Sequence, residues 1–293
     1  MPPPPATEPL RALAPAKVNL TLRVTGRRAD GYHLLDSLAV FAALGDRIAV
    51  RPAAALSLRV GGPFADGVPT GPENLVMRAA ERLRVLRRMG GGSGAEIALE
   101  KHLPHGGGIG GGSSDAAAAI GLLARLWGVA PLSAEEALPL GADVPVCLQA
   151  PRAARMEGIG ERVTALPGLP PAALVLVSPG LHVPTPRVFE ALRSGGTAIS
   201  APLDPPDAPM DLAALAAFAR RGGNDLQAAA VEVAPGIGAV LEALAAAPGL
   251  LAHGMSGSGS VCWGLAPDMG AARAAAALLR RPGWWVRAAR VLS

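Results

Sequence analysis

The sequence is poor in aromatic residues, which make up only 3% of its 293 residues and include a single tyrosine, Tyr32. Proteins that bind single-stranded nucleic acid need aromatic side chains on which the bases stack. The net charge is +4, but the basic residues are scattered and form no dense stripe of the kind that nucleic-acid binders carry. We therefore expect a small-molecule substrate and no nucleic-acid partner.

Cysteine is also scarce, since the chain has only Cys147 and Cys262, each flanked by apolar residues. We expect two buried free thiols, which fit a reducing cytoplasm. The five histidines show no metal-ligand spacing, so we predict no metal site built from side chains alone. The N-terminus lacks the features of a signal peptide, and every long uncharged run is interrupted by proline and glycine. We expect a cytoplasmic protein without a membrane segment.

Lysine and asparagine are rare enough to be informative. Of the 27 basic residues only Lys17 and Lys101 are lysines, and the only asparagines are Asn19, Asn74 and Asn224. The abundance of alanine, glycine, proline and arginine indicates a base-composition bias of the source genome. Residues that such a bias disfavours point to positions where their chemistry is needed.

The hydrophobic patterns predict an α+β protein. We place a boundary between an N-terminal domain, residues 1–158, and a C-terminal domain, residues 159–293, near a predicted hairpin at 158–160. Predicted strands cover 17–24, 34–41, 46–50, 56–60, 96–103, 174–177 and 284–291, with a turn leading into a strand over 253–265. Predicted helices cover 74–89, 115–127, 186–192, 211–219, 235–247 and 269–279.

Strict alternation over residues 17–24 predicts a half-buried strand, with Lys17 and Asn19 on its polar face about 7 Å apart. The ordinary alternative is the solvent face of an edge strand. Because lysine is so rare here, we favour a functional lysine at this position.

Six glycines surround Ile109 between a predicted strand and a predicted helix, and Ser113 and Ser114 follow them. Such a backbone approaches a ligand closely, and the N-terminus of the helix offers unpaired N–H donors, which together suit a phosphate. A flexible linker is the alternative. The segment lacks the Gly-Lys-Ser/Thr ending of a P-loop and the acidic strand end of a dinucleotide fold.

Asp143 lies in an apolar sequence, GADVPVCL, where an ionised carboxylate is costly unless it is paired. We expect it to pair with Lys17 and to accept or orient a substrate hydroxyl. A helix-capping aspartate is the alternative.

Two further features are candidates for substrate contact. Tyr32 and His33 follow a turn and could hold a flat ring, although surface placement is the alternative. Residues 256–260, SGSGS, form a second loop of small residues, for which a tight turn is an equal alternative.

Three motifs in this order, APAKVNLTL (14–22), LPHGGGIGGGSSDAAAA (103–119) and HGMSGSGSVCWGL (253–265), resemble those of the GHMP kinases over nearly the whole chain. The sequences RADGYHLLDS (28–37), GADVPV (141–146) and VPTPRVF (183–189) are similar to one branch of that family, whose acceptor carries a cytidine diphosphate group and belongs to isoprenoid precursor synthesis. The resemblance implies a two-domain GHMP-kinase fold with the active site in the inter-domain cleft. It also implies ATP as co-substrate and Mg²⁺ bound with the nucleotide.

The resemblance implies Lys17 and Asp143 as the catalytic pair. Its implied acceptor contacts are Asn19, Tyr32, His33, Thr185 and Phe189, the last of which could instead be a core anchor. Its implied ATP contacts are Asn74, Lys101, Pro104, His105, Gly106, Gly107, Gly108, Ile109, Gly110, Gly111, Gly112, Ser113 and Ser114.

The chain departs from the family between Trp127 and Asp143, where we expect about one more helical turn. Either the helix before Asp143 is short or the connection is rerouted. The rival functions are another GHMP kinase, acting on homoserine, mevalonate or a sugar, and a non-catalytic nucleotide-binding module. A monomer or weak homodimer is expected.

Overall fold

The computed structural model describes residues 8–90, 92–195, 199–205 and 210–293, which form two compact units interleaved along the chain. The predicted boundary at residues 158 and 159 stays a prediction, because the units are defined by contacts and each draws on three separate segments. Unit 1 comprises Met1–Ala14, Gly45–Leu103 and Gly111–Leu148, and unit 2 comprises Pro15–Leu44, Pro104–Gly110 and Gln149–Ser293.

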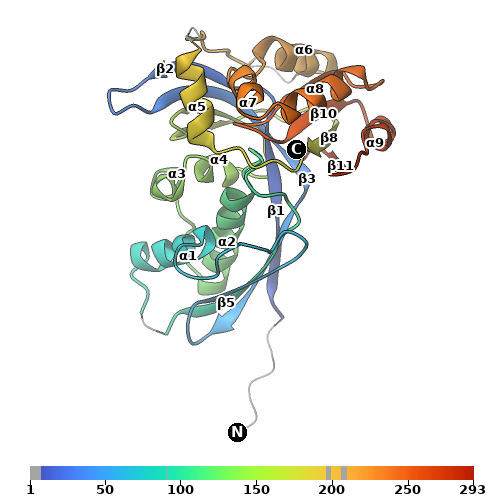
Figure 1. Ribbon diagram of the computed structural model, residues 1–293. Helices are drawn as coiled ribbons and strands as arrows, with labels where there is room; N and C mark the ends of the chain where they lie inside the picture. Colours follow the sequence, from blue (N-terminus) through green and yellow to red (C-terminus); the bar gives the residue numbers. More distant parts are fainter. Residues whose placement is uncertain (1–7, 91, 196–198, 206–209) are drawn as a thin grey trace. The chain divides into compact units, whose positions relative to one another are not determined.

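Unit 1 packs two helices, α1 (Leu75–Leu86) and α2 (Gly111–Trp127), against each other and over strands, as Figure 1 shows. Apolar residues from the helices and strands share one core. Strand β5 (Gly94–Glu100) runs parallel to β4 (Ser57–Gly61) and antiparallel to the second half of β3 (His33–Ala53). The unit ends with three short helices: α3 (Ala134–Ala137), η1 (Leu138–Leu140) and α4 (Val144–Cys147).

Helix α1 illustrates how the sequence sets an element. Asn74 caps its N-terminus, since the side-chain oxygen accepts a hydrogen bond from the Val76 amide at 2.8 Å. The buried residues Val76, Ala79, Ala80 and Leu83 recur at helical spacing, as the pattern predicted.

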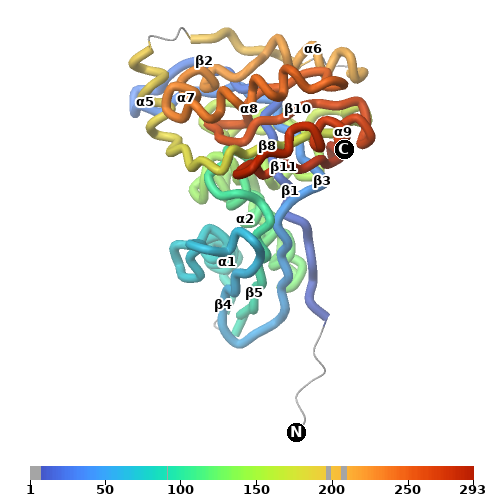
Figure 2. The backbone as a smooth tube through the Cα atoms, turned by 45° about the vertical axis from the view of Figure 1, so that its right-hand side comes forward, coloured from blue at the N-terminus to red at the C-terminus, as the bar shows by residue number. Residues whose placement is uncertain are grey.

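Unit 2 contains an antiparallel sheet of four strands, β8 (Ala173–Ser178), β9 (Ala252–Met255), β10 (Cys262–Ala266) and β11 (Trp285–Arg290). Their order in the sheet is β11-β8-β10-β9. The helices of the unit are α5 (Thr185–Ser194), α6 (Leu212–Gly222), α7 (Gln227–Val233), α8 (Gly236–Ala246) and α9 (Met269–Leu278). Alternate residues of β8, among them Val175 and Val177, pack with α8 and α9 into one core, and Figure 2 shows these helices beside the sheet.

The first half of β3 belongs to unit 2, where it pairs with β2 (Arg23–Arg27) and β6 (Ala154–Gly158). Strand β6 forms the predicted hairpin with β7 (Arg162–Ala165). Strand β1 (Leu10–Asn19) begins in unit 1 and ends in unit 2.

The α+β class is confirmed, while several element predictions are wrong. Residues 34–41 and 46–50 form one continuous strand, β3, and α7 was not predicted. The predicted strand 17–24 is interrupted after Asn19, because Leu22 instead forms a bridge to Asn224.

The described residues can be checked for membrane-spanning helices and for the burial of the two cysteines. Their helices include none that is both long and apolar enough to cross a membrane. Cys147 and Cys262 are buried and not disulfide-bonded, as predicted, and burial raises the pKa of the Cys262 thiol to about 12.

Candidate functional site

Lys17 and Asn19 lie at the end of β1 in unit 2, and both are buried. Lys17 Nζ donates to Asn19 Oδ1 at 2.9 Å, and Asn19 Nδ2 donates to Ser37 Oγ at 2.7 Å. The predicted half-buried strand is therefore wrong, because both of its faces are covered. Since Lys17 is only 2% exposed, the alternative of a solvent-facing edge lysine is wrong as well.

The Ser256 hydroxyl joins this strand to the glycine-rich segment within unit 2. It accepts from the Asn19 amide at 3.0 Å and donates to the Gly108 carbonyl at 2.9 Å. The Lys17 amide donates to the Ile109 carbonyl at 3.0 Å. The second loop of small residues thus holds the first loop in place with neutral hydrogen bonds, which the sequence did not reveal.

The glycines of this segment are required by the protein's own packing. Gly106, Gly108 and Gly110 have φ of 60°, 71° and 62°, a region that favours glycine. A Cβ on Gly108 would stand 2.3 Å from the Ser256 carbonyl oxygen, and one on Gly107 would stand 2.7 Å from Val261 Cγ2. Close packing within the protein therefore accounts for glycines that the sequence pattern alone linked to the approach of a ligand.

Helix α2 begins at Gly111, so the prediction that the loop extends to Ser114 and the helix starts at Asp115 is wrong. Gly111, Gly112, Ser113 and Ser114 form its first turn, where amide groups lack helical partners and can bind an anion. A Cβ on Gly112 would meet nothing within 4 Å. Ser113 is half-buried, whereas Ser114 is buried and donates its hydroxyl to Cys147 Sγ at 3.4 Å.

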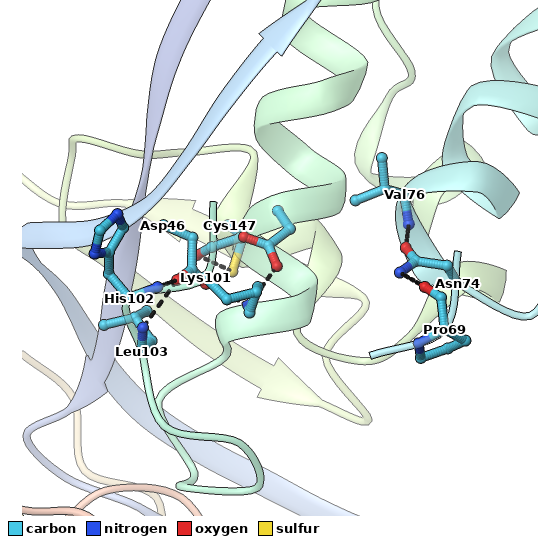
Figure 3. Close-up of polar contacts among 10 residues, drawn as sticks. Asp46, Pro69, Asn74, Val76, Lys101, His102, Leu103 and Cys147 are labelled. Carbon is cyan, nitrogen blue, oxygen red and sulfur yellow. Dashed lines mark hydrogen bonds and ion pairs between the residues drawn. The ribbon is translucent and has the colours of Figure 1, made fainter. Parts of the chain in front are cut away.

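Lys101 lies just after β5 and is buried between two carboxylates, neither of which was predicted to lie near it. Its Nζ donates to Asp46 Oδ2 and to Asp115 Oδ2, the latter at 2.6 Å, as Figure 3 shows for Lys101 and Asp46. We call these three residues of unit 1 the ion cluster. Asp46 lies inside a predicted strand and Asp115 at a predicted helix start, so neither carried a sequence signal of its own.

Asn74 is drawn in Figure 3 at the start of α1. Besides capping the helix, its Nδ2 donates to the Pro69 carbonyl at 2.6 Å. The side chain is 7% exposed. A local structural role is thus evident, and a contact with adenosine stays a prediction.

Asp143 is half-buried and stands at the N-cap position of α4 in unit 1. Its side chain makes no capping hydrogen bond, so the alternative of a helix-capping aspartate is wrong. The shortened connection before it is a short helix, α3 of four residues, followed by η1. Because Lys17 belongs to unit 2, the predicted Lys17–Asp143 pair stays a prediction.

Unit 2 brings together His33 and Phe189, which are far apart in the sequence. Their rings stack with centroids 4.6 Å apart and an interplanar angle of 19°. Burial, together with the charges of Arg27 and Arg193, lowers the pKa of His33, which favours a neutral imidazole. Tyr32 beside it is 64% exposed.

Thr185, the other predicted acceptor contact from this motif, lies at the start of α5. Its Oγ1 is 2.7 Å from Ser258 Oγ, so it also meets the second loop of small residues.

The family comparisons match both parts of the chain. The GHMP kinases N-terminal domain matches residues 74–152, and the GHMP kinases C-terminal domain matches residues 207–283. A relative from Cereibacter sphaeroides, named 4-diphosphocytidyl-2-C-methyl-D-erythritol kinase, is 52% identical over 290 residues, covering 96% of this chain and 99% of the relative. A relative of the same name from Ruegeria pomeroyi is 50% identical over 289 residues, covering 97% of this chain and 99% of the relative.

Solved structures agree. A crystal structure of 4-(cytidine 5'-diphospho)-2C-methyl-D-erythritol kinase is similar with a TM-score of 0.79 and 39% identity, covering 97% of this chain and 100% of that one. Homoserine kinase from Cytophaga hutchinsonii has a TM-score of 0.68 at 18% identity, covering 97% of this chain and 95% of that one, which shows a shared fold.

Proposed function

The chain belongs to the GHMP kinase family, and we propose that it transfers the γ-phosphate of ATP to a hydroxyl of 4-(cytidine 5'-diphospho)-2-C-methyl-D-erythritol. The observation that carries this function is the 52% identity, over 96% of the chain, to a kinase named for that substrate. The reaction is a step of non-mevalonate isoprenoid precursor synthesis.

Phosphoryl transfer depends on positioning and charge stabilisation more than on covalent catalysis. We assign Lys17 to the stabilisation of negative charge on the transferred group, because its ammonium is buried and held beside Asn19. We assign Asp143 to the acceptor hydroxyl, whose proton it accepts or whose direction it fixes. Its half-buried position and its place in the family-like sequence GADVPV (141–146) support this use.

We assign the ATP phosphates to the segment from Pro104 to Ser114. The first turn of α2 offers amide donors, and the space beside Gly112 leaves room for an anion. Asn74 borders the adenosine in this assignment.

Magnesium fits as a partner of the nucleotide. Among the described residues no group of three or more His, Cys, Asp or Glu side chains could hold a metal ion. Mg²⁺ is commonly bound through substrate phosphates and one or two protein oxygens, so no protein cage is required. The half-buried Ser113 hydroxyl and the Asp143 carboxylate are the groups that would hold it, and the ion would neutralise phosphate charge.

We assign the cytidine end of the acceptor to the aromatic group around Tyr32, His33 and Phe189. Two of these rings already stack in unit 2, and a neutral imidazole can both donate and accept a hydrogen bond to a base. Asn19 and Thr185 complete the proposed acceptor contacts.

An ADP-release assay with a panel of acceptors tests this function. With ATP, we expect turnover of 4-(cytidine 5'-diphospho)-2-C-methyl-D-erythritol and none above background with homoserine, mevalonate or galactose. Asp143→Asn, which preserves shape but removes the charge, should lower turnover about 10²- to 10⁴-fold and so exclude a contaminating kinase. Preferred turnover of another acceptor would overturn the substrate. No ADP release with any acceptor would favour a nucleotide-binding module.

A further inference from the structure

The ion cluster lies where the chain enters and leaves the glycine-rich segment. Residue 103 ends one stretch of unit 1 and Gly111 begins the next, while residues 104–110 between them belong to unit 2. Groups in unit 1 can therefore fix the residues on both sides of this segment.

Asp46 fixes the residues that lead into this segment. One carboxylate oxygen accepts from the backbone amides of His102 and Leu103, the latter at 2.9 Å, and the other accepts from Lys101 Nζ (Figure 3). Asp46 is fully buried, so these bonds are shielded from water. The last residues before the segment are thereby tied to β3.

Asp115 holds the departing chain from the fifth residue of α2. It accepts from Lys101 Nζ at 2.6 Å, which links the helix to the strand end. A Cβ on Gly111 would stand 3.6 Å from Lys101 Nζ and 3.7 Å from Asp46 Oδ2. The first residue of α2 therefore lies directly against the ion cluster.

This arrangement has a high free-energy cost of desolvation for a contact with only a structural role. Two carboxylates share one ammonium in a buried place, and Asp115 Oδ1 is buried without a hydrogen-bond partner among the described residues. Burial and the charge of Asp46 raise the pKa of Asp115 to about 7, against the opposing effect of Lys101. Apolar residues of similar volume often stabilise such a site better than buried ions.

We infer that the ion cluster is a positioning device that sets the two ends of the ATP-binding segment and thereby the place of the nucleotide phosphates. The inference rests on the proposed function only in assigning ATP to residues 104–114. Lys101 then acts through the segment and does not contact adenosine, and Asp46 and Asp115 join the residues on which nucleotide binding depends.

Asp46→Ala tests the device. It removes the acceptors of two backbone amides and of Lys101, and we expect the ATP dissociation constant, measured by calorimetry, to rise about 10- to 100-fold. The KM for the acceptor should stay within about 2-fold. This constant separates a local effect from a general loss of structure, since the latter would raise both constants. Asp46→Asn keeps an oxygen for the His102 and Leu103 amides and should recover most of the ATP affinity.

Hydrogen exchange of the nucleotide-free protein provides a readout that does not depend on activity. Asp46→Ala should accelerate exchange in residues 102–114 while leaving β8 unchanged. Glu96→Gln is the matched control, since Glu96 lies on β5, bonds to Arg51 on β3 at 2.9 Å, and belongs to an exposed ion pair. It should change neither exchange in residues 102–114 nor ATP affinity.

Two results would overturn the inference. One is an unchanged ATP dissociation constant and unchanged exchange in both Asp46→Ala and Asp115→Asn. The other is loss of ATP affinity in Lys101→Met alone, which would place the lysine against the nucleotide. If the wild type bound no ATP, the proposed function would fail while the exchange result still judged the positioning device.

Discussion

The glycine-rich segment is flanked in unit 1 and packed in unit 2 by contacts of different chemistry. In unit 1 the residues next to its two ends are held by charged side chains, those of Asp46, Lys101 and Asp115. In unit 2 its interior is tied by neutral groups, through the Ser256 hydroxyl and the close contacts of Gly107 and Gly108. The ionic end should respond to changes in charge and pH, and the neutral interior to changes in volume.

The difference matters because each kind of contact fails in its own way. A buried ion pair that loses one partner leaves an uncompensated charge. A tightly packed glycine that gains a side chain must move backbone, which cannot be relieved by a change of rotamer. Substitutions of the two kinds should therefore separate stability from nucleotide affinity.

Gly108→Val should have the largest effect on stability. Its Cβ would overlap the Ser256 carbonyl oxygen at 2.3 Å, and its φ of +71° is strained for valine. We expect the free energy of unfolding to fall by about 2–6 kcal/mol, measured by urea denaturation. A loss below about 1 kcal/mol would show that the loop yields easily, and the packing argument would fail.

Gly112→Val should instead spare stability and impair binding. The added side chain enters open space at the first turn of α2, where we place the phosphates. We expect the ATP dissociation constant to rise about 10-fold or more, measured by calorimetry, with little change in unfolding. Gly121→Val, in the same helix and equally open, is the control. Equal ATP affinity in both variants would contradict the phosphate assignment.

Ser256→Ala removes the neutral link between β1 and the glycine-rich segment. The Asn19 amide and the Gly108 carbonyl lose a buried partner, so we expect a loss of about 1–3 kcal/mol in unfolding free energy. Ser194→Ala, whose hydroxyl is exposed and bonded to its own helix, should cost much less. Indistinguishable unfolding curves for the two variants would refute a structural role for Ser256.

Unit 1 should also show a pH dependence of its stability. Because the pKa of Asp115 is raised to about 7 from an ordinary 3.8, the folded state holds a proton that the unfolded chain releases between these values. The stability that this proton supplies is complete below about pH 4 and is lost as pH rises to about 7. Lys101 contacts this carboxyl, and Asp46 contacts the same ammonium group.

Asp115→Asn should remove that dependence, so its stability relative to the wild type should increase from pH 5 to pH 8. Denaturation at both pH values measures the difference. Asp30→Asn, which removes a carboxylate at an exposed position, is the control. A difference between wild type and Asp115→Asn that is constant with pH would contradict a raised pKa.

Local patterns predicted most elements but not their ends. The predicted helix over 74–89 began at Asn74, and the structure shows that this residue is the cap of α1, a local interaction between residues two apart. The start of α2 at Gly111 was not readable, since glycine disfavours helices and only contacts with residues distant in sequence, such as the ion cluster, hold it there. The break after Asn19 likewise depends on Asn224, about two hundred residues away.

The candidate site divides in the same way. Rare residues and motifs identified Lys17, Tyr32 and His33, and the structure joins His33 to Phe189. The charges around Lys101 could not be predicted, because Asp46 and Asp115 each look ordinary in their local sequence. Their significance arises only when strand and helix are brought together.

Tyr32→Ala tests the proposed acceptor most directly. Because the Tyr32 side chain is 64% exposed and lies outside the core, its removal should leave the fold intact. A stacked ring contributes about 1–3 kcal/mol per base. We therefore expect the KM for the cytidine diphosphate acceptor to rise about 5- to 150-fold. The KM for ATP should stay near that of the wild type, and Tyr32→Phe, which keeps the ring, should behave like the wild type. A rise in the KM for ATP with an unchanged KM for the acceptor would contradict the account.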